Sequence, residues 1–166
     1  MNKKRKNILI VLVCIVLALG TGVFFFGKKF VEKKIIKTIE MTWNNSETED
    51  EPEFLKEITK KSSYEIVSIE DGDIYTVNVV VKGIDVGEKL KNLTYEDFAK
   101  VESEKEWDGY MREIIEACEI IETPAAIYAE KTKDGYEISF TDTFVDAMSG
   151  KIYSYYMDIV NETLEK

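Results

Sequence analysis

Hydrophobic and polar residues follow three different patterns along this chain, and each pattern predicts a different kind of element. Residues 8–26 read ILIVLVCIVLALGTGVFFF and contain no charge. A helix of about 20 apolar residues spans the hydrocarbon core of a bilayer. Further along, apolar residues recur at helical spacing in some segments and alternate with polar residues in others. The sequence therefore predicts an N-terminal transmembrane helix, followed by an α+β domain with an antiparallel sheet packed against helices.

We interpret residues 8–26 as a transmembrane anchor rather than a cleaved signal peptide. The apolar part of a signal peptide is usually about 7–15 residues long and ends in small residues, whereas this segment is longer and ends in three phenylalanines. The residue before Cys14 is valine, which does not suit a lipoprotein signal. A short basic tail ahead of a first apolar segment stays inside, and long domains translocate largely regardless of charge. We therefore expect residues 1–7 to be cytoplasmic and the C-terminal domain to be extracytoplasmic.

The first half of the domain has a helical part and a strand part. Helical spacing predicts a juxtamembrane helix over residues 28–43, which we expect to pack with the domain. Its basic stretch Lys28–Lys37 either lies along anionic headgroups or is a solvated start to the helix. The acidic run Asn44–Glu53 predicts a loop, so residues 27–53 form a juxtamembrane segment before the domain at 54–166. Further elements are expected as a short helix at Glu53–Lys60 and strands at Tyr64–Glu70 and Asp73–Lys82.

The second half is predicted to contain longer helices around a second pair of strands. Asp85 begins a brief helix, and Thr94 with Asp97 forms a capping box that opens a long helix. The apolar stripe of that long helix runs from Phe98 to Ile121 and ends before Pro124. Strands are expected at Ala125–Thr132 and Tyr136–Phe140, followed by a last helix from about Asp142. Gly150 in that last helix is either tolerated or marks a kink.

Each predicted strand pair contains an Asp-Gly dipeptide, which is a signal for a two-residue hairpin turn. The dipeptides are Asp71–Gly72 and Asp134–Gly135. Alternate apolar residues of the flanking strands share one face, which we expect to be buried. They are Tyr75, Val77, Val79 and Val81 in the first hairpin, and Tyr136, Ile138 and Phe140 in the second.

Composition and charge exclude several classes of function. The chain has a net charge of −10, and residues 27–166, with all 32 acids and 18 of the 22 basic residues, carry −14. Such a surface repels phosphates, so we expect no nucleic-acid partner. Histidine is absent, which removes imidazole as a base, nucleophile or metal ligand. Cys118 is the only cysteine outside the anchor, so it forms no disulfide within the domain, and we expect it to pack in the core. We predict no cofactor, no metal site and no enzymatic activity.

Two groups of acidic residues are candidate sites. The first, Glu47, Glu49, Asp50, Glu51 and Glu53, has oxygen ligands that suit calcium but lacks the spacing of a calcium loop, so a solvated loop is favoured. The second consists of Glu65, Glu70, Asp71 and Asp73 around a hairpin turn. Paired carboxylates can act as acid and base, but acids beside a turn glycine usually serve the turn.

Tyrosines form the candidate ligand or partner surface. We single out Tyr75, Tyr136 and Tyr155, because aromatic side chains between helix and sheet can line a pocket. Such tyrosines also serve as core residues whose hydroxyls reach the surface. A third possibility is an exposed aromatic patch that docks a partner.

One stretch carries a resemblance to known proteins. The run KDGYEISFTDTFVDAMSGKI, Lys133–Ile152, resembles the closing strand and helix of uncharacterised membrane-anchored domains of Gram-positive bacteria. The whole arrangement is similar to cystatin-like or nuclear transport factor 2-like cones, although a cone that ends on a strand lacks the final helix seen here. The resemblance implies helices packed on a curved sheet and assigns no catalytic residue.

The class of function is predicted from three features together: the transmembrane anchor, the α+β pattern and the lack of residues that suit catalysis. Twenty of the 22 basic residues are lysine, which is typical of an AT-rich bacterial genome. We expect a single-pass domain outside a bacterial membrane, held by the lipid bilayer through residues 8–26, that contacts another envelope protein without catalysis. The alternative is a small-ligand-binding or hydrolytic cone-shaped domain that uses carboxylates.

Overall fold

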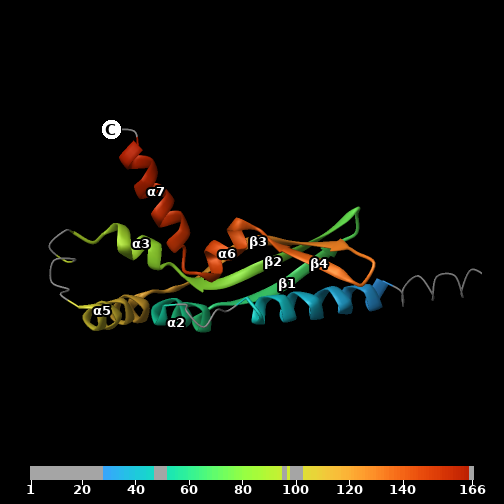
Figure 1. Cartoon of the computed structure of the whole chain (residues 1–166), viewed down its shortest axis with the longest axis horizontal. Coiled ribbons are helices and arrows are strands. Elements are labelled where there is room, and N and C mark those ends of the chain that lie inside the picture. The colour runs from blue at the N-terminus through green and yellow to red at the C-terminus, as the bar shows by residue number, and fades with distance from the viewer. Residues whose placement is uncertain (1–27, 47–51, 95–96, 98–102, 165–166) are drawn as a thin grey trace, which may run out of the picture.

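The computed structural model describes residues 28–46, 52–94, 97 and 103–164 (Figure 1). Within these ranges no helix has both the length and the apolar character needed to cross a bilayer. The predicted tail 1–7 and anchor 8–26 lie outside the described residues, as does most of the acidic loop. Their predicted roles therefore stay predictions.

The described chain is α+β, with a four-stranded antiparallel sheet and several helices. It begins with a helix at residues 28–44, which agrees closely with the predicted juxtamembrane helix. The other elements are α2 (Glu53–Lys61), β1 (Ser63–Glu70), β2 (Ile74–Ile84), α3 (Val86–Lys91), α5 (Glu104–Ala117), β3 (Ile120–Lys131), β4 (Tyr136–Phe140), α6 (Asp142–Met148) and α7 (Ile152–Leu164).

The sheet has the order β1-β2-β3-β4 and buries one face. Opposed residues point to the same side of a sheet, and the register places Val77 opposite Ile127 and Val79 opposite Ala125. Val77, Val79 and Val81 are buried, so the predicted core face of β2 is confirmed. The other face carries polar side chains, among which Lys82 lies between Glu65 (3.8 Å) and Glu122 (3.7 Å).

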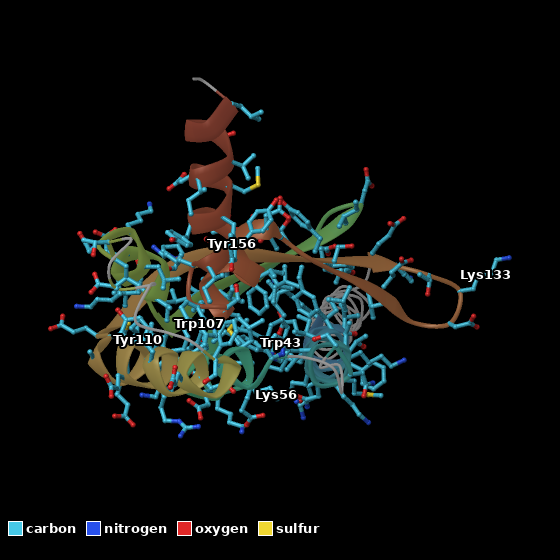
Figure 2. The ribbon with its side chains drawn as sticks, turned by 60° about the vertical axis from the view of Figure 1, so that its left-hand side comes forward. Trp43, Lys56, Trp107, Tyr110, Lys133 and Tyr156 are labelled. Carbon is cyan, nitrogen blue, oxygen red and sulfur yellow. The ribbon has the colours of Figure 1, made fainter. Side chains whose placement is uncertain are left out.

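Two helices cover the buried face of the sheet and form the first core with it. Ile35 and Ile39 of the 28–44 helix are fully buried against the sheet, as is Phe144 of α6. Trp43 meets the Phe144 ring edge-on, with the ring centroids 5.3 Å apart. Figure 2 shows Trp43 among the side chains below the sheet. The 28–44 helix therefore packs into the same core as the sheet.

A second core lies where helices gather at one end of the sheet (Figure 1). It joins residues of β2, α2, α3, α5 and the start of α7: Ile58, Ile84, Val86, Leu90, Met111, Ile114, Ile115 and Ile152. On the surface, the Arg112 Nε of α5 donates to the Glu57 Oε1 of α2 at 3.1 Å. Helices far apart in sequence are thus held together mainly by aliphatic burial.

Both hairpin loops are longer than the predicted two residues. In the first, Glu70 pairs with Thr76, and Gly72 does not adopt a positive φ. In the second, Lys131 pairs with Tyr136, and the Thr132 N–H donates to the Gly135 carbonyl at 3.0 Å. The prediction of two-residue turns was wrong because the register, set by the buried faces of the strands, fixes where pairing stops.

The predicted long helix up to Ile121 was also wrong. Helix α5 ends at Ala117, and residues 120–131 form β3, which pairs with β2 from Ile84 to Ile74. Pro124 lies on β3 beyond the end of β4, where one edge of β3 has no neighbouring strand. A proline is tolerated at such an edge. Apolar spacing alone could not distinguish the start of this strand from a continuing helix.

The capping contact of Thr94 is present, but one continuous helix does not follow it. The Thr94 N–H and Oγ1 both donate to Asp97 Oδ2, at 2.9 and 2.7 Å. Ser103 is extended, and its Oγ accepts from the Glu106 N–H at 3.3 Å to begin α5. A second N-cap therefore separates α5 from the segment that Thr94 opens. Phe98 and Val101 lie outside the described residues.

The predicted last helix is two helices with a sharp break. Gly150 and Lys151 have φ values of +71° and +58°, in the left-handed region. The Gly150 carbonyl accepts the N–H groups of Val86 and Gly87, each at 3.0 Å. The break therefore fixes the start of α7 against α3, and α7 projects away from the rest of the molecule (Figure 1). Gly150 therefore marks a kink, rather than being tolerated inside one continuous helix.

Candidate functional site

The structure brings together two of the three candidate tyrosines. The Tyr75 and Tyr136 rings meet edge-on at 5.8 Å and pack against the first core. Tyr155 lies on α7 and packs against the second core. The three residues therefore do not line a common cavity, and the pocket that would favour a ligand-binding cone is not formed from them.

The environments of Tyr75 and Tyr155 favour neutral phenols. Burial raises the pKa of Tyr75, and the nearby Asp71 carboxylate raises it further. Burial also raises the pKa of Tyr155. Raised pKa values keep the phenolic proton in place at neutral pH. Neither side chain is therefore prepared to act as a base or nucleophile.

The acidic residues of the first hairpin serve local contacts. Glu70 Oε1 accepts from Asn78 Nδ2 at 2.7 Å, and Glu65 belongs to the exposed Lys82 ion pairs. Asp71 and Asp73 are exposed at the turn. In the part of the chain that the structure describes, no three acidic or cysteine side chains gather in a way that could hold a metal ion. Of the five acidic residues in the loop, only Glu53 is among the described residues, and it is exposed in the first turn of α2.

A surface cleft of about 470 Å³ lies between α3, α6 and α7. It combines carboxylates with two lysines and one exposed tyrosine. The lining residues are Asp85, Gly87, Glu88, Lys91, Thr123, Asp142, Thr143, Asp146, Ala147, Lys151, Tyr153, Ser154 and Tyr155. These residues come from separate elements and form no sequence motif, which is why sequence reasoning missed the cleft.

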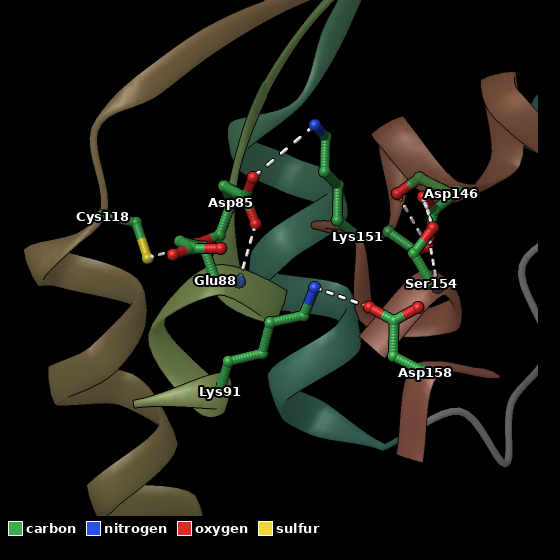
Figure 3. A network of polar contacts seen from close by, with 9 residues as sticks. Asp85, Glu88, Lys91, Cys118, Asp146, Lys151, Ser154 and Asp158 are labelled. Carbon is green, nitrogen blue, oxygen red and sulfur yellow. Dashed lines mark hydrogen bonds and ion pairs between the residues drawn. The ribbon is translucent and has the colours of Figure 1, made fainter. Parts of the chain in front are cut away.

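Most charged groups of the cleft hold helices in place (Figure 3). Asp85 Oδ1 accepts from the Glu88 N–H at 2.8 Å, and Asp85 Oδ2 lies 3.6 Å from Lys151 Nζ. Asp146 accepts from the Ser154 N–H at 2.9 Å and from Ser154 Oγ at 2.6 Å. Both carboxylates thereby satisfy N–H groups in the first turn of a helix, α3 and α7 respectively. Their positions are explained by helix capping without a ligand.

An ion pair below the cleft clamps α7 to α3. Lys91 Nζ lies 2.6 Å from Asp158 Oδ2, and this hydrogen bond raises the pKa of Lys91 (Figure 3). Leu90, Leu93, Tyr155 and Ile159 lie around the same contact. One side of α7 therefore packs against α3.

Cys118 follows α5 and contacts the same region. Its Sγ donates to the Asp85 carbonyl at 3.5 Å, and the side chain is partly buried against the second core. Burial raises the pKa of this thiol, which disfavours the reactive thiolate. The expectation that Cys118 packs rather than reacts agrees with this environment, although it caps the end of α5 instead of lying on its face.

The opposite side of α7 exposes large apolar side chains. Tyr153, Tyr156, Met157, Val160 and Leu164 have exposed fractions of 53, 59, 41, 47 and 79%; we call these five residues the α7 stripe. Figure 2 shows α7 rising from the body of the molecule above Tyr156. Tyr153 also lines the edge of the cleft, and the described residues leave the rest of this side exposed.

Comparison with protein-family models yields no match, and neither curated proteins nor solved structures give a significant one.

Proposed function

We propose that this protein is a single-pass, membrane-anchored interaction domain of the bacterial cell envelope, without enzymatic activity. Residues 8–26 would hold it in the lipid bilayer with the N-terminus in the cytoplasm and the domain outside. Another protein would be its partner, and no nucleic acid or cofactor is involved. The α7 stripe would be the contact surface.

The exposure of the α7 stripe carries this proposal. Single apolar residues on a surface are common, but a group of adjacent large ones marks an interaction site in a stable domain. Tyrosine and methionine are also enriched at protein interfaces. The α7 helix is capped by Asp146 and clamped by Lys91, so its outward face is presented on a fixed support.

The alternative function, a ligand-binding or hydrolytic cone using carboxylates, has less support. Its best location is the cleft between α3, α6 and α7, whose carboxylates Asp85 and Asp146 already accept helix N–H groups. The resemblance to cystatin-like cones adds no residue to that cleft.

Site-specific photo-crosslinking tests the contact surface. A photo-reactive amino acid would replace Val160 in the full chain expressed in its membrane, and a matched variant would carry it at Glu137, which is exposed on β4. We expect a protein adduct from position 160 that position 137 does not give. Absence of any protein adduct at 160 contradicts the proposal.

Sidedness is tested separately. Alkaline phosphatase fused to the C-terminus should be active, since the enzyme folds only outside the cytoplasm of a bacterium. An expressed but inactive fusion would place the domain in the cytoplasm.

A further inference from the structure

The five residues of the α7 stripe form one continuous uncharged face. Positions 153, 156, 157, 160 and 164 follow the spacing that places residues on one side of a helix. Tyr155 and Asp158 lie on the other side, where they meet α3. None of the five residues is charged, in a domain that is otherwise strongly acidic.

The size of the stripe matches half of a small specific interface. An aromatic side chain contributes 150–250 Å² when fully buried, and the exposed fractions of the five side chains imply roughly 500 Å² for the stripe. Two such stripes fully buried against each other give at most roughly 1,000 Å², which is the threshold for a specific protein contact and below the size of standard stable interfaces. An equally apolar surface of similar length is therefore a fitting occupant.

The stripe is complementary to itself in an antiparallel pair. Its tyrosines lie in the first half of α7, and its aliphatic residues Val160 and Leu164 lie in the second. When two such helices run in opposite directions, the rings of one oppose the aliphatic side chains of the other. Antiparallel helices also align their dipoles favourably. A two-fold axis relates both halves of such a contact.

The direction of α7 suits this symmetry in a tethered protein. The 28–44 helix runs along the length of the molecule, whereas α7 runs across it (Figure 1). A two-fold axis along the length of the molecule reverses the direction of α7 but leaves the direction of the 28–44 helix unchanged. An antiparallel α7 pair whose two-fold axis lies along this length therefore begins at the same end in both copies, as two chains anchored in one membrane must.

We propose that the α7 stripe binds the same stripe of a second copy, forming a two-fold symmetric, antiparallel α7 pair. This inference rests on the proposed function and names its partner. Because the stripe is uncharged while both copies are acidic, salt screens the repulsion between the copies. Self-association should therefore strengthen as the salt concentration rises. A basic partner held by charge would instead bind more weakly as the salt concentration rises.

Light scattering of the full chain in a neutral detergent tests this pairing. We expect the protein mass of two chains in the wild type, with more dimer at 0.5 M than at 0.05 M salt. Val160→Asp places a charge within the stripe and should weaken dimerisation at least tenfold. Asn161→Asp adds the same charge beside the stripe and should retain the dimer. Both variants keep residues 8–26, so pairing of anchors would not distinguish them.

Three results would overturn the inference. They are a monomeric wild type at every concentration and salt, a Val160→Asp dimer as strong as the wild type, and equal loss in both variants while each retains the wild-type unfolding midpoint. If the wild type is monomeric but position 160 still crosslinks to a protein of another mass, the interaction function stands and only self-pairing fails. If position 160 gives no protein adduct, both fail.

Discussion

The 28–44 helix and α7 are both amphipathic, but the molecule uses their apolar faces in opposite ways. Ile35 and Ile39 of the first helix are fully buried against the sheet, and lysines dominate its outward side. Helix α7 buries Ile152 at its start and leaves the five residues of its stripe exposed. The apolar face of the first helix is therefore part of the core, whereas most of the apolar face of α7 is on the surface.

Polar contacts account for the difference in placement. The Gly150 carbonyl, Asp146 and Lys91 fix the start and one side of α7, so the helix is held outward instead of folding onto the sheet. The 28–44 helix instead packs lengthwise against the sheet, joined by Trp43 to the ring of Phe144. Burial therefore stabilises the first helix, whereas capping and a short contact with α3 orient the second.

The largest expected effect comes from placing a charge on each helix. Ile39→Asp puts a carboxylate into the first core and should cost about 3–5 kcal/mol or more, because a buried charge without a partner is expensive. Val160→Asp should change the free energy of unfolding of the single chain by less than about 0.5 kcal/mol, as exposed positions usually do. Urea titration of both full-length variants at a concentration below dimerisation measures this. Equal losses of unfolding free energy in the two variants would contradict the view that the first helix is buried and α7 is exposed.

A methyl group at the break before α7 should have the next largest effect. In Gly150→Ala the new Cβ would lie 2.9 Å from Ile58 Cγ2 at a φ of +71°, which should cost about 1–3 kcal/mol. The matched change Gly109→Ala in α5 meets no atom within 4 Å and should stabilise by about 0.5–1 kcal/mol. The urea midpoints should therefore move in opposite directions. A neutral Gly150→Ala would show that the break is not held rigidly.

The clamp between α7 and α3 should give the smallest effect. Asp158→Asn removes the partner of the exposed Lys91 ammonium and should lower the urea midpoint slightly, with the loss vanishing at high salt. The folded pKa of Lys91 is raised, so the clamp contributes fully below pH 10.5 and is lost as the pH rises through the folded pKa. Thermal unfolding of wild type and variant at pH 8 and pH 11.5 should therefore converge. A gap that persists at pH 11.5 contradicts an ionic clamp.

Local patterns in the sequence predicted most elements but not all of their ends. Alternation at Val77, Val79 and Val81 identified the buried face of β2, and Asp85 identified the start of α3. The helix expected to reach Ile121 failed because pairing with β2 draws residues 120–131 into the sheet. The spacing of apolar residues within a short segment does not show whether that segment pairs with a distant strand.

The candidate surfaces could be predicted only in part. The sequence predicted the last helix, but whether Val160 or Tyr156 is covered depends on the direction that α7 takes after Gly150. The cleft could not be predicted for a similar reason, since Asp85 is distant in the sequence from Lys151 and Ser154 and meets them through helix packing. Amphipathicity shows that a face needs a partner and does not show which one.

The most direct measurement compares thiol labelling at two positions in intact membranes. Val160→Cys and Glu137→Cys, each in a chain with Cys14→Ser and Cys118→Ser, would be exposed to a membrane-impermeant maleimide on cells. Both positions are exposed in the single chain. We predict fast labelling at 137 and at least tenfold slower labelling at 160, with the difference lost when the purified chain is diluted to monomer. Equally fast labelling at both positions on cells would contradict a covered α7 stripe.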